Sequence, residues 1–204
     1  VIKEYFEDYF LHQSDVTFDF TNGRRDMVVH NTSVEPWRVT VADTGYATMT
    51  AGRINRIRPY VDDEPFMLTY GDGVSDVDPN DILAFHRASG AVVTLTAVKA
   101  SQRFGVLDID DGGCVGDFRE KSDSDDVYIN GGFMVCEPGV FDVIKRREDP
   151  DGDDFSGVTL EALARSGELS AYRYDGFWSC MDTQRDMQQL IALWNAGDAP
   201  WKVW

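Results

Sequence analysis

Two aspartates stand where an α/β protein binds its ligands. Asp72 lies between two glycines at the end of residues 65–70, an apolar run typical of a central strand buried on both faces. Asp182 follows a strand-like segment and opens the last helical pattern of the chain. Ligands of open α/β sheets sit beyond the carboxyl ends of the strands. If such a ligand carries phosphates, the two carboxylates need a cation between them and the phosphates, and Mg²⁺ is the usual choice.

Each aspartate also has an ordinary structural interpretation. Asp72 in Gly-Asp-Gly is equally consistent with a turn residue. Asp182 is well suited to cap the following helix, and taken alone the cap is the better interpretation. The pairing of the two residues at strand ends shifts the balance toward a shared metal site.

Further polar residues could hold phosphate or sugar. Lys121 follows a strand-like segment and Arg53 lies in a helical pattern, although each alone is typical of a solvated surface charge. The segment 130–132, Asn-Gly-Gly, interrupts a strand and allows either a bulge or the close approach of a sugar. The three histidines are far apart and share no motif, so a histidine-based mechanism has no support.

The hydrophobic pattern supplies the elements that must position these residues. Residues 17–20 and 26–30 flank Asn22-Gly23, which predicts a hairpin. Further strands are predicted at 38–44, 65–70, 91–98, 104–109, 116–119, 128–136 and 169–174. Helices are predicted at 1–12, 49–58, 80–90, 140–147, 160–166 and 183–196. The strand-helix-strand unit over 65–98 predicts a parallel sheet with a right-handed crossover, and all 204 residues are expected to form one domain.

Composition narrows the functional classes. The net charge of −17 disfavours nucleic-acid binding, because the phosphates would be repelled. No apolar run approaches the roughly 20 residues of a membrane span. The three cysteines match neither a metal spacing nor a disulfide framework, and the opening residues show no signal-peptide pattern. A cytoplasmic protein without membrane or nucleic-acid partners is therefore expected.

Short motifs along nearly the whole chain carry a family resemblance. They are Val1–Phe6, Ser14–Phe18, Val34–Trp37, Asp43–Gly45, Tyr70–Val74, Arg103–Gly105, Glu120–Lys121, Ile129–Phe133, Gly176–Trp178, Met181–Thr183 and Ala199–Lys202. In this order they resemble the sugar-1-phosphate nucleotidylyltransferases. The Tyr-Gly-Asp-Gly-Val and Glu-Pro-Trp stretches and the Trp-rich end favour the glucose-1-phosphate cytidylyltransferases within that family.

The resemblance implies a fold and an activity. The fold would be a Rossmann-like nucleotide-diphospho-sugar transferase fold, with a mixed, mostly parallel sheet flanked by helices and a small β-hairpin region. The reaction would be CTP plus glucose 1-phosphate to CDP-glucose plus diphosphate, with Mg²⁺ as cofactor, in nucleotide-sugar synthesis for surface polysaccharide. A homo-oligomer is expected.

The resemblance also implies residue roles. Asp72 and Asp182 would bind Mg²⁺ and, with Lys121 on the sugar phosphate, would form the catalytic set. Glu120 would lie near the hexose together with Asn130, Gly131 and Gly132. The nucleotide side would be lined by Thr48, Arg53 and Gly71.

The chain departs from the family pattern in two places. The family opens with a strand and a Gly-rich loop that cradles the triphosphate, and nothing here matches them. We expect that segment upstream of Val1, and we expect these 204 residues alone to be inactive. Ser122 replaces the usual proline after Glu120-Lys121, so the turn that presents Lys121 is expected to differ.

Other functions stay open. Transfer to another base or another hexose would use the same residues. A non-catalytic paralogue could bind sugar nucleotides or complete an oligomer, and the sequence upstream of Val1 would discriminate it from an enzyme. An oxidoreductase is poorly supported, since no G-x-G-x-x-G follows a strand.

Overall fold

The computed structural model describes residues 1–21, 26–99, 106–109, 115–119 and 128–203. The chain divides into two compact units, residues 1–45 and residues 46–204. The single domain expected from the sequence stays a prediction. Within the described ranges, none of the helices is both long and apolar enough to span a membrane.

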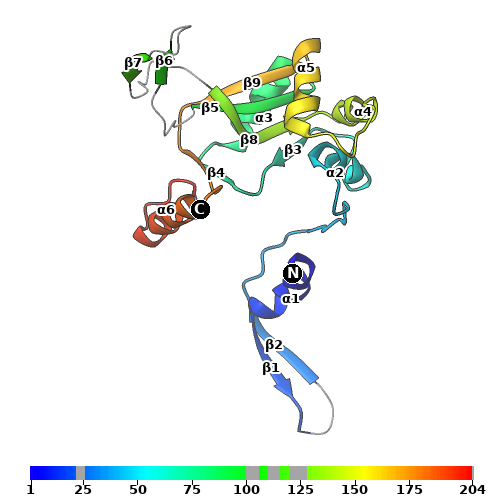
Figure 1. Ribbon diagram of the computed structural model, residues 1–204. Helices are drawn as coiled ribbons and strands as arrows, with labels where there is room; N and C mark the ends of the chain where they lie inside the picture. The colour runs from blue at the N-terminus through cyan, green and yellow to red at the C-terminus, as the bar shows by residue number, and fades with distance from the viewer. Residues whose placement is uncertain (22–25, 100–105, 110–114, 120–127, 204) are drawn as a thin grey trace. The chain divides into compact units, whose positions relative to one another are not determined.

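The first unit is a helix followed by a hairpin (Figure 1). Helix α1 covers Ile2–His12, and strands β1, Ser14–Asp19, and β2, Asp26–Thr32, pair antiparallel, which confirms the predicted helix and hairpin. The turn predicted at Asn22-Gly23 lies outside the described residues. The strand predicted at 38–44 is wrong, because that segment belongs to no helix or strand. Alternating side chains favour an extended backbone, but a strand also needs a neighbour with which to exchange hydrogen bonds.

A four-stranded mixed sheet forms the centre of the second unit. Its order is β3-β8-β5-β9, where β3 is Phe66–Thr69, β8 Tyr128–Cys136, β5 Val93–Lys99 and β9 Leu169–Tyr174. Strand β8 pairs antiparallel with both β3 and β5, whereas β5 and β9 are parallel. The expected mixed sheet is confirmed. The expectation of mostly parallel pairing is wrong, because β8 enters between β3 and β5 and separates the two strands of the predicted unit.

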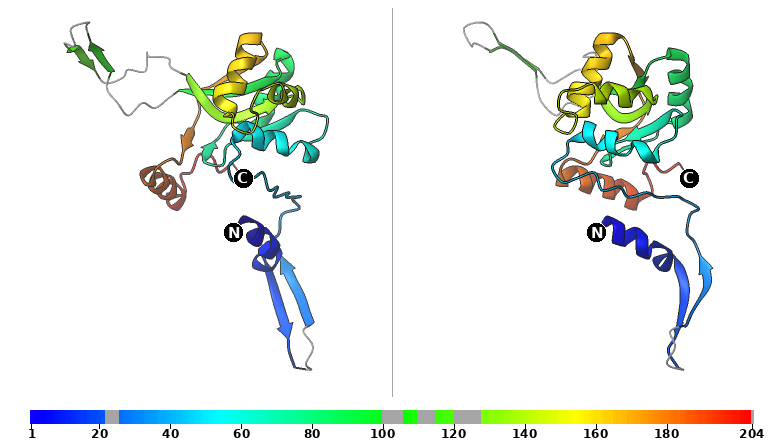
Figure 2. Two further views of the ribbon diagram at one scale, coloured as in Figure 1. Left: turned by 45° about the vertical axis from the view of Figure 1, so that its right-hand side comes forward. Right: turned by 90° about the vertical axis from the view of Figure 1, so that its right-hand side faces the viewer.

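Helices cover both faces of this sheet (Figure 2). One face carries the helices α2 (Thr50–Arg56), α4 (Gly139–Lys145) and α5 (Leu160–Ser166) and the π-helical turn η2 (Phe155–Thr159). The other face carries α3, Pro79–Ser89. Neighbouring residues of β8 show the two sides, since Met134 packs in the first cluster and Val135 in the second. The result is an α/β arrangement of three layers.

Short elements complete the second unit. Two of them are antiparallel ribbons: β4 (Gly73–Ser75) with β10 (Trp178–Cys180), and β6 (Val106–Ile109) with β7 (Val115–Arg119). The others are the 3₁₀ turn η1 (Arg58–Tyr60) and the helix α6 (Gln184–Ala196). Helix α3 ends at Gly90, which adopts the left-handed conformation with φ +67°, as the sequence predicts.

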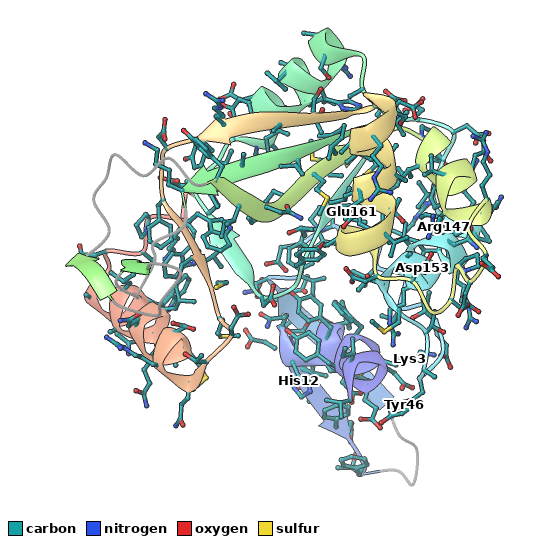
Figure 3. The ribbon with its side chains drawn as sticks, turned by 45° about the horizontal axis from the view of Figure 1, so that its top comes forward. Lys3, His12, Tyr46, Arg147, Asp153 and Glu161 are labelled. Atoms are coloured by element: carbon teal, nitrogen blue, oxygen red, sulfur yellow. The ribbon has the colours of Figure 1, made fainter. Side chains whose placement is uncertain are left out.

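An acidic loop holds α2 in place. The loop 146–154 is closed by an ion pair between Arg147 Nε and Asp153 Oδ2 at 2.9 Å (Figure 3). Its backbone carbonyls accept hydrogen bonds from the start of α2, at 2.7 Å from Asp151 to the Met49 amide and at 3.2 Å from Asp153 to the Ala51 amide. These bonds satisfy amides at the helix start that have no partner within the helix.

Candidate functional site

The β4–β10 ribbon brings the two sequence-predicted carboxylates to one place. In this ribbon, Ser75 pairs with Trp178 and Gly73 pairs with Cys180 in antiparallel register. The Met181 amide then donates a hydrogen bond to the Asp72 carbonyl at 2.8 Å, which extends the ladder by one residue. Asp182 follows directly. Asp72 and Asp182 therefore stand at the same end of the ribbon, although they are far apart in the sequence.

The cap interpretation of Asp182 is not what the structure shows. Helix α6 is capped by Thr183, whose Oγ1 accepts a hydrogen bond from the Asp186 amide at 3.2 Å, while Asp186 Oδ2 accepts from the Thr183 amide at 3.0 Å. The Asp182 carboxylate is exposed and accepts a hydrogen bond from Cys180 Sγ at 3.2 Å. Burial, followed by that hydrogen bond, raises the pKa of the Cys180 thiol, so Cys180 is a neutral donor to the carboxylate.

Asp72 occupies an exposed turn between β3 and β4, as its turn interpretation also predicts. Two exposed carboxylates at one ribbon end are hard oxygen donors, which suit Mg²⁺ when phosphate oxygens supply further ligands. Among the described residues there is no group of three or more metal-binding side chains, so protein ligands alone do not form a closed metal cage there.

Glycines allow the ribbon to pack closely on strand β8. Trp178 Nε1 donates a hydrogen bond to the Gly131 carbonyl at 2.8 Å. A Cβ at Gly131 would lie 3.0 Å from Val98 Cγ1 and 3.1 Å from the Thr96 carbonyl oxygen, so a side chain there would displace the sheet. The register of β5 and β8 shifts at this place, as the bulge interpretation of the Asn-Gly-Gly segment predicts.

The next glycine holds an aromatic ring. Gly132 has φ +81°, and a Cβ there would lie 2.9 Å from Tyr70 Cδ2. Its amide donates to Asn130 Oδ1 at 2.9 Å, and its carbonyl accepts from the Tyr70 amide at 3.3 Å. The Tyr70 hydroxyl forms a short hydrogen bond with Ser156 Oγ on η2. The ring of Tyr70 is thus fixed from two sides, immediately before Gly71 and Asp72.

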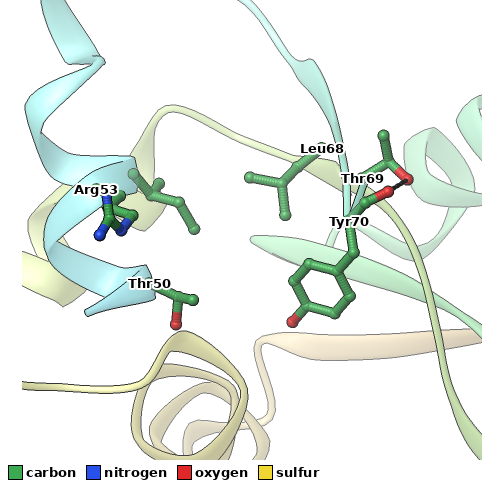
Figure 4. A pocket seen from close by; sticks show the side chains of 6 residues that line it. Thr50, Arg53, Leu68, Thr69 and Tyr70 are labelled. Carbon is green, nitrogen blue, oxygen red and sulfur yellow. Dashed lines mark hydrogen bonds between the residues drawn. The ribbon is translucent and has the colours of Figure 1, made fainter. Parts of the chain in front are cut away.

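A cavity of about 150 Å³ lies between α2 and β3 (Figure 4). It is lined by Thr50, Arg53, Ile54, Leu68, Thr69 and Tyr70. The Arg53 guanidinium donates a hydrogen bond to the Tyr46 carbonyl at 3.2 Å. Thr50 Oγ1 donates to Asp154 Oδ1 at 2.7 Å and accepts from the Phe155 amide at 2.7 Å, which ties this wall of the cavity to η2.

The remaining predicted residues are distributed differently. Thr48 is buried beside Gly52, where a Cβ on the glycine would lie 2.6 Å from Thr48 Cγ2, and it does not line the cavity. Gly71 is exposed in the turn that carries Asp72. Glu120 and Lys121 lie outside the described residues. Sequence reasoning gave Tyr70 and Trp178 no individual roles, although both belong to the motifs quoted above.

Comparisons with known proteins identify the family of this chain. The nucleotidyl transferase family model matches residues 13–195. The chain belongs to the nucleotidyl transferase family. It is 50% identical to a glucose-1-phosphate cytidylyltransferase of Salmonella typhi and 39% identical to a probable one of Bacillus subtilis. In both cases the similarity covers 100% of this chain and 77% of the relative. These relatives confirm the resemblance to the cytidylyltransferase group that the motifs indicate.

Solved structures support the fold. A putative glucose-1-phosphate thymidylyltransferase of Bacillus anthracis matches with TM-score 0.56 at 18% identity, over 76% of this chain and 63% of that chain. An inositol-1-phosphate CTP transferase of T. maritima matches with TM-score 0.53 at 14% identity, over 77% and 64%. These two matches confirm the predicted α/β fold of the nucleotidyltransferase type. The chain spans a little under two thirds of either solved relative.

Proposed function

We propose that this protein transfers a cytidylyl group from CTP to glucose 1-phosphate. The observation that carries the proposal is the ribbon register, which joins Asp72 and Asp182 at one end. Asp72 also follows Tyr70, which lines the cavity with Arg53, by two residues. The 50% identity to the glucose-1-phosphate cytidylyltransferase of Salmonella typhi supports this choice of base and sugar.

The reaction joins two phosphates in line. An oxygen of the glucose 1-phosphate phosphate attacks the α-phosphorus of CTP, the bond from that phosphorus to the bridging oxygen breaks, and diphosphate leaves. No covalent nucleophile is needed, so the protein contributes positioning and charge neutralisation. Bound Mg²⁺ would neutralise the triphosphate oxygens.

Each site residue has a proposed task in this scheme. Asp72 and Asp182 would hold Mg²⁺ through their carboxylates. On the nucleotide side, Arg53 would contact the triphosphate with Gly71 near it. Thr48, which is buried beside Gly52, would instead support the helix that carries Arg53. On the sugar side, Lys121 binds the sugar phosphate. The hexose lies near Glu120, Asn130, Gly131 and Gly132.

A nucleotide panel tests the proposal. The full-length protein is purified and incubated with glucose 1-phosphate, Mg²⁺ and one of CTP, UTP, dTTP, ATP or GTP, and nucleotide sugars are separated by anion-exchange chromatography. We expect CDP-glucose as the main product. A larger kcat/KM with another nucleotide would reassign the base. No product with any nucleotide would favour the binding paralogue. Galactose 1-phosphate and mannose 1-phosphate serve as matched sugar controls, and faster turnover of either would reassign the hexose.

A further inference from the structure

The carboxylate of Asp76 ties the β4–β10 ribbon to the main sheet. Asp76 directly follows β4 and is half-buried. Its Oδ1 accepts two hydrogen bonds, from the Tyr174 hydroxyl at 2.5 Å and from the Phe177 amide at 2.8 Å. Its own amide donates to the Phe177 carbonyl at 3.3 Å. Tyr174 is the last residue of β9 and Phe177 directly precedes β10, so one carboxylate holds both ends of the link between these strands.

The partners of Asp76 are themselves fixed. Tyr174 packs against the cluster of Val77 and Val135 on the α3 face of the sheet. Burial, followed by the hydrogen bond to Asp76, raises the pKa of the Tyr174 hydroxyl well above its ordinary value, so the hydroxyl stays a neutral donor. Phe177 stacks on Trp201 with ring centroids 5.5 Å apart. A carboxylate held by such rigid donors has one preferred geometry.

Among the described residues, a second side-chain bond joins this end of the ribbon to the main sheet, from Trp178 Nε1 to the Gly131 carbonyl at 2.8 Å. The ladder of β4 and β10 has three residue pairs, and a two-stranded ribbon is marginally stable by itself. Ser75 Oγ adds one bond, to the Phe177 carbonyl at 2.8 Å. The Asp76 contacts close one end of the ribbon, while the Met181 amide and the Asp72 carbonyl close the other.

We infer that Asp76 is a positioning residue that, through Tyr174 and Phe177, fixes the register of the ribbon and so keeps Asp72 and Asp182 together. The expected effect of Asp76 on metal binding rests on the proposed function, because that function assigns the two carboxylates to Mg²⁺. The expected effect of Asp76 on the ribbon register is independent of the proposed function. Asp76 itself stands at the opposite end of β4 from Asp72 and is not placed on the substrates.

Asp76→Ala tests the inference, with Asp78→Ala as its matched control. Asp78 lies two residues on and also accepts a backbone hydrogen bond, from the Asn80 amide at 2.8 Å, but it caps α3 and its hydrogen bonds come from Asn80 of that helix. Hydrogen–deuterium exchange of the Met181 amide is measured in the metal-free protein. We expect Asp76→Ala to speed this exchange about tenfold or more, and Asp78→Ala to leave it near the wild-type rate.

The second readout is the Mg²⁺ concentration that gives half-maximal turnover. Asp76→Ala should raise it about 10-fold, as loss of a ligand-orienting contact does, and should change the KM for glucose 1-phosphate by less than about twofold. Asp76→Asn keeps an acceptor oxygen and should restore most of the wild-type value. Tyr174→Phe removes one of the two hydrogen bonds that the Asp76 carboxylate accepts, so it should raise the Mg²⁺ requirement less than Asp76→Ala does. It replaces Asp76→Ala as the test variant if that variant does not fold.

The outcomes separate the two claims. Unchanged Met181 exchange in Asp76→Ala or Tyr174→Phe would overturn the inference. Faster exchange with an unchanged Mg²⁺ requirement would also overturn it, because the ribbon would then be loosened without effect on the metal site. If the wild-type protein forms no nucleotide sugar, the proposed function fails, and the exchange rates alone decide whether Asp76 holds the ribbon.

Discussion

The Met181 amide donates a 2.8 Å hydrogen bond to the carbonyl oxygen of Asp72. This bond joins two segments that the sequence separates by most of the second unit. It also sets the register that places Asp182 beside the turn of Asp72. The candidate metal site therefore depends on backbone pairing in a short ribbon as much as on the two carboxylates.

The cap of α6 should contribute to stability independently of the metal site. Thr183→Ala removes the Oγ1 acceptor of the capping box, and we expect it to lower the free energy of unfolding by about 1 kcal/mol. Urea denaturation measures this. Asp182→Ala is the control, because Asp182 does not cap the helix, and it should have a smaller effect on unfolding. A larger loss for Asp182→Ala would show that the cap is assigned to the wrong residue.

Gly132 should be sensitive to any side chain. Gly132→Ala must place a residue at φ +81° with its Cβ 2.9 Å from Tyr70 Cδ2. Gly90→Ala is the matched control, since Gly90 has φ +67° and nothing within 4 Å of the added Cβ. Both variants lose roughly 1–2 kcal/mol for the left-handed backbone. We expect Gly132→Ala to lose about 1–3 kcal/mol more, because the Tyr70 ring must move.

Urea denaturation of the two glycine variants compares these losses directly. Equal losses would mean that Tyr70 adjusts without cost. They would then argue against a ring fixed between Gly132 and Ser156.

Asp154 should make stability depend on acid pH. The hydrogen bond from Thr50, followed by that from the Gly157 amide, lowers the pKa of Asp154 below its ordinary value. A lowered folded-state pKa gives stability that is present above the pKa of the unfolded carboxyl and is lost as the pH falls through the folded pKa. Asp154→Asn should therefore be destabilised at neutral pH, and its deficit should shrink below about pH 4.

Thermal unfolding of Asp154→Asn across this pH range checks the expectation. Thr50→Val removes the largest cause of the lowered pKa and should show the same trend with smaller amplitude, because the Gly157 amide remains. A deficit that grows as the pH falls would contradict the assignment.

The sequence predicted the long elements well because their patterns are local. The helix closed by Gly90 and the existence of a strand before Asp72 both follow from a pattern that neighbouring residues complete. The prediction that this strand is central and buried on both faces is wrong, because β3 lies at an edge of the described sheet and its residues alternate between half-buried and exposed. The position of β8 between β3 and β5 depends on contacts remote in sequence, and no local pattern reports it. The strand predicted at 38–44 fails for the same reason, since alternation specifies a face but supplies no neighbour.

The site was predictable by residue type and much less by contact. Asp72 and Asp182 stand out through their places after strands, whereas the three-residue strands β4 and β10 are too short to show a period. The cap of α6 could have been found, because Thr183 and Asp186 have the spacing of a capping box. The role of Asp76 could not, because its partners Tyr174 and Phe177 approach it only in the folded chain.

The most direct measurement of the central claim is CDP-glucose formation from CTP and glucose 1-phosphate by the full-length protein as wild type, as Asp72→Asn and as Asp182→Asn. Removal of one negative charge from a site that must hold Mg²⁺ against a triphosphate should lower kcat/KM about 100-fold or more. The unfolding temperatures should stay close to the wild-type value, because both side chains are exposed. Near-wild-type turnover by either variant at limiting Mg²⁺ would contradict the account.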